Sequence, residues 1–153
     1  MDFHIGDRKM GMVDIEDKRE VERIAIAEGR IKLKRKTIEA IENNKIKKGD
    51  PFKTAETAAL LAIKNTSNVI PHCHPLPIMY ADIQFSIEGY EITCRCEVKT
   101  SYRTGVEMEA LHGVTIALLT VWDMVKYLEK NEQGEYDTTK IYDIRVVRKI
   151  KGE

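Results

Sequence analysis

The stretch TGVEMEALHGVTIALLTVWDMVK, residues Thr104–Lys126, decides how this chain folds. Its apolar residues recur in alternating steps of three and four, which places them on one stripe of an α-helix. They are Leu111, Val114, Leu118, Val121, Val125 and, just beyond the stretch, Leu128. The other faces are also nearly free of charge between Ala110 and Trp122. A helix that is apolar most of the way round is a buried one, so the sequence predicts a long helix at the centre of the fold.

The two ends of this helix carry the charges that its middle lacks. Glu107 and Glu109 lie at its start and Lys126 at its end, where each opposes the helix dipole. Asp123 differs, because the same dipole disfavours a carboxylate late in a helix. A charge placed against a local preference often marks a site, so Asp123 is a candidate functional residue.

The separation of these charges has a consequence for assembly. On one unbroken helix, Glu109 and Asp123 would lie about 21 Å apart at about 1.5 Å per residue. One small substrate can hardly contact both groups. Either the helix starts later, or a neighbouring subunit completes the pocket, and we predict a site shared within a homo-oligomer.

Length and composition bound the class of protein. The chain has 153 residues, 42% of them hydrophobic, which suits one domain with one core. The formal net charge is zero, so we expect no nucleic-acid or membrane partner driven by a global field. Three cysteines, an odd number, favour a reducing cytoplasm over a disulfide framework. We find neither a signal peptide nor an apolar run of about 18 residues.

The remaining periodicities predict an α+β fold. We expect a first strand at Val21–Leu33, in which Gly29 marks a bulge or bend. Alternating apolar residues predict a hairpin of Ala81–Ile87 and Tyr90–Val98 around the turn at Gly89. Shorter helices are expected at Thr37–Ile41 and Thr54–Lys64, and a last strand at Ile141–Val147.

This order of elements predicts an antiparallel sheet with helices packed on one face. We expect a single domain over residues 13–153, preceded by an N-terminal extension, residues 1–12.

The segment IPHCHPLP, Ile70–Pro77, holds three prolines in seven residues, so it is a rigid loop. Its His72, Cys73 and His74 resemble metal ligands, but zinc needs three or four protein ligands. Cys94 and Cys96 lie on the apolar face of the predicted hairpin, where cysteine acts as a small hydrophobe. We therefore favour a functional histidine in a stiff loop and expect no metal site, with a zinc-binding protein as the weaker alternative.

Two segments are candidate phosphate-binding sites. Lys48 precedes Gly49-Asp50 in the loop Lys45–Phe52, where exposed amides and a cation suit a phosphate group. Arg103-Thr104-Gly105 comes just before the long helix, and helix N-termini bind anions.

Taken together, these segments resemble the cyclic pyranopterin monophosphate synthase family, molybdenum cofactor biosynthesis protein C. The matching pieces follow the family's order: MVDI (Met12–Ile15), KGD (Lys48–Asp50), IPHCHP (Ile70–Pro75), TGVEMEAL (Thr104–Leu111) and DMVK (Asp123–Lys126). The resemblance runs from about Val13 to Val147, and TGVEMEAL is its most specific part. It implies a ferredoxin-like subunit in a hexamer of three dimers, with the pocket at the dimer interface.

The reaction that the resemblance implies converts 3′,8-cyclo-7,8-dihydro-GTP into cyclic pyranopterin monophosphate and releases diphosphate. This is lyase chemistry of the phosphorus-oxygen type without a redox cofactor, although Mg²⁺ beside the phosphates is possible. By resemblance, Asp123 is the catalytic carboxylate, and Lys48, Lys126 and His74 are the other catalytic residues. Desolvation would lower the pKa of a lysine that moves protons. The implied substrate-binding residues are Asp14, His72, Cys73, His74, Glu107, Met108 and Glu109.

One alternative is a non-catalytic module that binds a nucleotide triphosphate and leaves it unchanged. Three features depart from the family pattern. His72 stands where the family often has an apolar residue, and the extension before Met12 matches nothing in the family. The chain ends in Arg148–Glu153 rather than in a Gly- and Ser-rich tail, so lysines would have to supply any phosphate contact made there.

Overall fold

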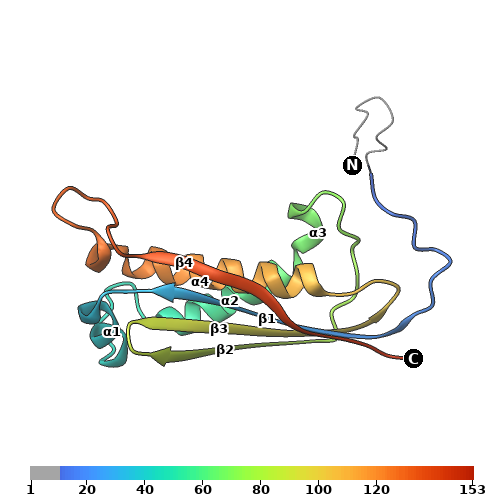
Figure 1. Ribbon diagram of the computed structural model, residues 1–153, viewed down its shortest axis with the longest axis horizontal. Coiled ribbons are helices and arrows are strands. Elements are labelled where there is room, and N and C mark those ends of the chain that lie inside the picture. Colours follow the sequence, from blue (N-terminus) through green and yellow to red (C-terminus); the bar gives the residue numbers. More distant parts are fainter. Residues whose placement is uncertain (1–10) are drawn as a thin grey trace.

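A computed structural model of the protein describes residues 11–153, and Figure 1 labels its elements. In chain order they are β1 (Val21–Lys32), α1 (Arg35–Glu42), α2 (Pro51–Lys64), α3 (Thr66–Val69), β2 (Tyr80–Glu88), β3 (Glu91–Tyr102), α4 (Glu107–Glu129) and β4 (Lys140–Lys151). The predicted N-terminal extension, residues 1–12, lies almost entirely outside the described residues.

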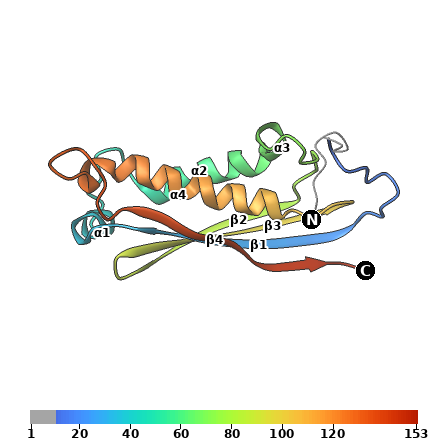
Figure 2. The ribbon, with the colours of Figure 1, turned by 45° about the horizontal axis from the view of Figure 1, so that its top comes forward.

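The four strands form one antiparallel sheet in the order β2-β3-β1-β4. The helices α2 and α4 pack side by side on one face of this sheet (Figure 2). A β-α-β-β-α-β succession with this strand order is the ferredoxin-like arrangement. The α+β prediction is therefore confirmed.

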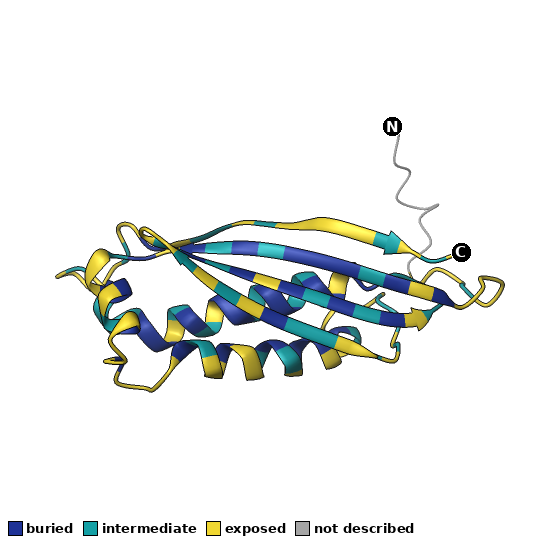
Figure 3. Ribbon diagram, turned by 90° about the horizontal axis from the view of Figure 1, so that it is seen from below, coloured by how far each residue is buried: buried dark blue, intermediate teal, exposed yellow. Residues whose placement is uncertain are grey.

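The helix α4 is the centre of the core, as its periodicity predicts. Val114, Leu118, Val121 and Val125 are fully buried, and in Figure 3 the buried residues of the helices face those of the strands. With 23 residues and a mean hydropathy of 1.3 over 18 of them, α4 is long and apolar enough to cross a membrane, although the sequence led us to expect no such run. Half of that window is buried, and the helix packs on α2, β1, β3 and β4, so its core position accounts for its apolar character.

Gly29 is required in β1 for close packing. A Cβ there would lie 2.7 Å from Cγ1 of Val114 and 2.9 Å from Cγ1 of Ile144. The pairing of β1 with β4 also shifts register between Glu28 and Arg30, which confirms the expected irregularity.

Several boundaries differ from the prediction for local reasons. The helix α2 begins at Pro51 because the side chain of Asp50 accepts hydrogen bonds from Phe52 N and Lys53 N. The strand β4 continues to Lys151, since its charged last residues pair with β1 up to Arg23. The short helix α3 was not predicted, because four residues carry no periodicity.

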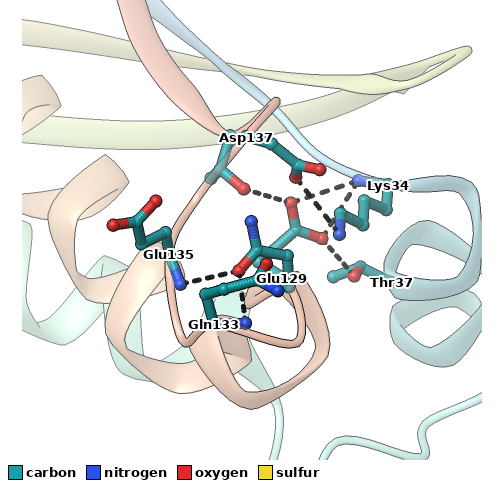
Figure 4. Close-up of polar contacts among 8 residues, drawn as sticks. Lys34, Thr37, Glu129, Gln133, Glu135 and Asp137 are labelled. Atoms are coloured by element: carbon teal, nitrogen blue, oxygen red, sulfur yellow. Dashed lines mark hydrogen bonds and ion pairs between the residues drawn. The ribbon is translucent and has the colours of Figure 1, made fainter.

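A buried carboxylate joins the end of α4 to its neighbours (Figure 4). Glu129 is fully buried and accepts hydrogen bonds from Lys34 N, 3.0 Å from Oε2, and from the Thr37 hydroxyl. The Thr139 hydroxyl donates to its other oxygen at 2.5 Å. Lys34 and Thr37 lie at the start of α1, and Thr139 comes just before β4, so Glu129 fixes both segments against α4.

Candidate active site

The predicted site residues gather at the two ends of α4. Most of the predicted substrate-binding residues, with His74, lie at its N-terminal end, and Lys48, Asp123 and Lys126 lie near its C-terminal end. The helix is unbroken from Glu107 to Glu129, so a later start is excluded. Glu109 and Asp123 are therefore about 21 Å apart along the axis.

A cavity of about 490 Å³ opens at the N-terminal end of α4. This volume lies within the range of small-molecule sites, about 300–1,000 Å³. Six of the predicted substrate-binding residues line it: His72, Cys73, His74, Glu107, Met108 and Glu109. Thr104 and Gly105, part of the second candidate phosphate site, line it as well.

Glu109 is the most deeply buried acid of this cavity, with 3% exposure. Its Oε2 lies 3.5 Å from Cys73 Sγ, and its Oε1 has no hydrogen-bond partner among the described residues. Burial raises the pKa of Glu109, and the negative charge of Glu107 adds to the rise. A carboxyl group of this kind can hold a proton and give it up to a bound substrate.

Cys73 is kept as a thiol by the same surroundings. Burial, the charge of Glu109 and the hydrogen bond to Glu109 together raise the pKa of Cys73 to about 11. Nucleophilic attack requires the thiolate, so Cys73 lines the cavity as a weak donor.

The pKa of Glu107, two residues before Glu109, is shifted in the opposite direction. Burial raises its pKa, but the hydrogen bond and charge of Lys149, a backbone N–H and the charge of Arg23 outweigh burial, so the pKa is lowered. Lys149 Nζ lies 2.9 Å from Glu107 Oε1. Gly105 makes room for this carboxylate, because a Cβ there would lie 2.6 Å from both of its oxygens.

His74 is held by the N-terminal segment. Its Nε2 lies 2.7 Å from the carbonyl oxygen of Val13, and since a carbonyl only accepts, Nε2 carries the hydrogen. Arg103 Nη1 donates to the carbonyl of Glu16 at 3.1 Å and fixes the same segment. Asp14 is exposed and its carboxylate accepts from Glu16 N at 2.9 Å, so its backbone neighbours, rather than its side chain, border the cavity.

At the other end of α4, Asp123 lies between two lysines. Its Oδ2 is 3.1 Å from Lys48 Nζ and its Oδ1 is 2.9 Å from Lys126 Nζ. The hydrogen bonds from Lys126 and then Lys48 lower the pKa of Asp123, and Asp123 in turn raises the pKa of Lys126. In the single subunit the pKa of Lys126 is therefore raised rather than lowered, contrary to our expectation for a proton-transferring lysine, because Asp123 outweighs the effect of desolvation. All three side chains are 43–57% exposed.

A cationic cleft beside the cavity holds residues that the sequence did not single out. Lys18, Arg19, Arg23 and Lys151 line it, together with Val21, and Lys18 borders the cavity too. Arg23 is only 4% exposed, and no carboxylate among residues 11–153 pairs with it within 4 Å. Its Nη2 reaches Arg103 O at 3.4 Å while its Nε has no partner there. A buried guanidinium with no carboxylate in direct contact is suited to binding an anion, although the charge of Glu107 acts on it at longer range. An isolated arginine in a strand pattern does not reveal this property in the sequence.

No group of three or more His, Cys, Asp or Glu side chains among residues 11–153 is arranged to hold a metal ion.

Comparison with known proteins identifies relatives over nearly the whole chain. A 52% identical relative from Archaeoglobus fulgidus, matched over 97% of this chain and 96% of its own length, is named a probable cyclic pyranopterin monophosphate synthase. A Thermococcus onnurineus protein of the same name is 51% identical, with 98% and 96% covered. A Methanothermobacter thermautotrophicus protein, 47% identical with 98% and 94% covered, is named a probable cyclic pyranopterin monophosphate synthase accessory protein. Residues 12–152 match the model of the MoaC family, and the chain belongs to that family.

Proposed function

We propose that this protein is a cyclic pyranopterin monophosphate synthase, which converts 3′,8-cyclo-7,8-dihydro-GTP and releases diphosphate, in molybdenum cofactor biosynthesis. The observation that carries the proposal is that α4 presents two acids of different character. Glu109 is buried in a cavity at one end of the helix, and Asp123 lies ionised between two lysines near the other end. The relatives' names give the product, cyclic pyranopterin monophosphate, and we assign the proton transfers of its formation to these two groups.

Rearranging a purine to a pterin needs proton donors and acceptors at ring atoms. Glu109, with its raised pKa, is the proton donor, and His74 Nε2–H can exchange Val13 O for a substrate acceptor. The Glu107 carboxylate, fixed by Lys149, orients the ring through its charge.

Closing the cyclic phosphate forms one P–O bond at the α-phosphorus and breaks the bond to the leaving diphosphate. The attacking hydroxyl loses a proton, for which the ionised Asp123 is the acceptor. Lys48 and Lys126 stabilise charge on the phosphate oxygens, a lyase role of the phosphorus-oxygen type. The cationic cleft at Arg23 is suited to the remaining phosphates, and Mg²⁺ can accompany them there.

These steps need both ends of α4 in one place, so the site is shared between subunits. A two-fold axis perpendicular to α4 near its middle brings the N-terminal end of one helix to the C-terminal end of its partner. Leu119, near that middle, is an exposed apolar residue on α4, which suits such a contact. We propose a homohexamer of three such dimers in the cytoplasm, where the three free cysteines stay reduced.

The test is diphosphate release by the purified protein from 3′,8-cyclo-7,8-dihydro-GTP, with GTP as the control substrate. We expect one diphosphate per pterin product and none from GTP. Binding of the cyclised nucleotide without any diphosphate release would contradict the proposal and identify a binding module.

A further inference from the structure

The loop that carries Lys48 joins α1 to α2 and covers the C-terminal end of α4. Lys48 Nζ reaches both the carboxylate of Asp123, at 3.1 Å, and its backbone carbonyl, at 3.2 Å. A lysine has a flexible four-carbon stem, so the position of its ammonium depends on where the loop backbone is held.

One side chain of α4 holds this backbone beside Lys48. The hydroxyl oxygen of Tyr127 accepts a hydrogen bond from the backbone N–H of Lys47 at 2.9 Å. Lys47 Nζ also lies 5.1 Å from the centre of the Tyr127 ring, a cation–π distance. The other backbone hydrogen bonds found in this loop stay local, from Lys45 N to Ala40 O and from Gly49 N to Ile46 O.

The contact lies on the same face of α4 as the carboxylate that Lys48 approaches. Tyr127 follows Asp123 by four residues, one turn of the helix, and it is the neighbour of Lys126. Ile46 is buried in the core and anchors the loop through its side chain. Glu129 fixes the start of α1, the helix that precedes the loop. The Tyr127 hydroxyl adds the link from α4 to the residue directly before Lys48.

We propose that Tyr127 is a positioning residue, which holds the Lys47 backbone so that the Lys48 ammonium stays against Asp123. The inference rests on the proposed function, because it assigns Tyr127 a part in the step that uses Lys48. Tyr127 itself need not touch the substrate.

The variant Tyr127→Phe removes the acceptor oxygen and keeps the ring. We expect kcat to fall roughly 10-fold while KM stays within about two-fold, since small misplacements of a reacting group act on turnover. Tyr80→Phe is the matched control, because Tyr80 also has a lysine over its ring, Lys99 Nζ at 5.0 Å, and lies on β2. Its kcat should stay that of the wild type.

A double-mutant cycle shows whether Tyr127 acts through Lys48. In a Lys48→Gln background, Tyr127→Phe should cause no further loss of the residual turnover. Wild-type kcat in Tyr127→Phe, or an equal further loss in the Lys48→Gln background, would overturn the inference.

Hydrogen exchange of the backbone over residues 45–50, measured without substrate, tests the contact itself. We expect faster exchange in Tyr127→Phe than in the wild type, and no change in Tyr80→Phe. Unaltered exchange in Tyr127→Phe would contradict the hydrogen bond between the Lys47 backbone N–H and the Tyr127 hydroxyl oxygen, and with it the inference. Hydrogen exchange needs no turnover. It therefore tests the role of Tyr127 even if the wild-type protein releases no diphosphate and the proposed function fails.

Discussion

The Cys73 thiol and the Glu109 carboxyl group lie 3.5 Å apart at the N-terminal end of α4. Burial raises the pKa of both groups, Glu109 raises the pKa of Cys73 further, and the hydrogen bond from Cys73 acts in the opposite direction on Glu109. This relationship makes the reactivity of Cys73 a report on Glu109. Because the pKa of Cys73 is about 11, we expect very slow alkylation by iodoacetamide at pH 7.5. Glu109→Gln removes the ionisable carboxyl group, whose charge and hydrogen bond raise the pKa of Cys73, and should speed alkylation at that pH by several-fold, measured by mass spectrometry. Cys73→Ser controls for the buried Cys94 and Cys96, and an unchanged rate in Glu109→Gln would contradict the coupling.

The opposite pKa shifts of Glu109 and Glu107 predict opposite effects on stability. The raised pKa of Glu109 means that its contribution to stability is full below its ordinary value of 4.5 and is lost as pH rises through the raised pKa. Glu109→Gln should therefore raise Tm at pH 7, because the variant carries no carboxyl group that ionises at a cost to the folded state. The gain should vanish near pH 4.

Glu107→Gln is the paired control. The pKa of Glu107 is lowered, so its contribution is present above 4.5 and is lost as pH falls through the lowered pKa. Glu107→Gln should lower Tm at pH 7. Thermal melts from pH 4 to pH 7 that show the same sign for both variants would refute this assignment of the two acids.

Asp123→Asn should separate function from folding. The side chain is 57% exposed, and solvent screens its two ion pairs, so their loss should change the free energy of unfolding little. Turnover should fall about 10²–10⁴-fold, the range for loss of a general acid or base. Near-normal turnover in a folded Asp123→Asn protein would remove Asp123 from the reaction.

Close packing at Gly29 predicts a large effect of one methyl group. Gly29→Ala would drive a Cβ to 2.7 Å from Val114, in a strand that cannot move away from the sheet, and should cost about 1–3 kcal/mol. Gly113→Ala meets only the Ile63 side chain, at 2.9 Å, and Cys96 Sγ at 3.2 Å, and it gains about 1 kcal/mol of helix propensity. Denaturant unfolding should therefore show a markedly larger loss at position 29, and equal losses would contradict this packing.

Much of the fold follows from periodicity, because a buried stripe and an alternating hairpin each leave a repeat in the sequence. The stripe from Val114 to Val125 is buried as predicted, and the turn at Gly89 has the positive φ, 59°, that its position required. The end of β4 could not be predicted in this way, since Arg148 and Lys149 are charged and are paired only because β1 lies beside them.

The candidate site, like the fold, could be predicted only in part from the sequence. Position relative to the helix dipole singled out Asp123, because an acid late in a helix is visible in the sequence. The same dipole accounts for Glu107 and Glu109 as ordinary helix-start acids, and they entered the predicted site only through the family resemblance. Arg23 was missed because its burial depends on β3, β4 and the segment around Arg103, which are distant in sequence. Tyr127 was missed because its partner is a backbone N–H 80 residues away.

The shared site is the central claim, and mixing two inactive variants tests it most directly. Glu109→Gln and Asp123→Asn each damage every site when present alone. If one site takes Glu109 from one subunit and Asp123 from its partner, a mixed dimer has one site with both defects and one with none. Co-expression or joint refolding at equal amounts should then restore about one quarter of wild-type diphosphate release, since half of the dimers are mixed. No recovery in verified mixed oligomers would contradict the account, because each subunit would then need both of its own residues.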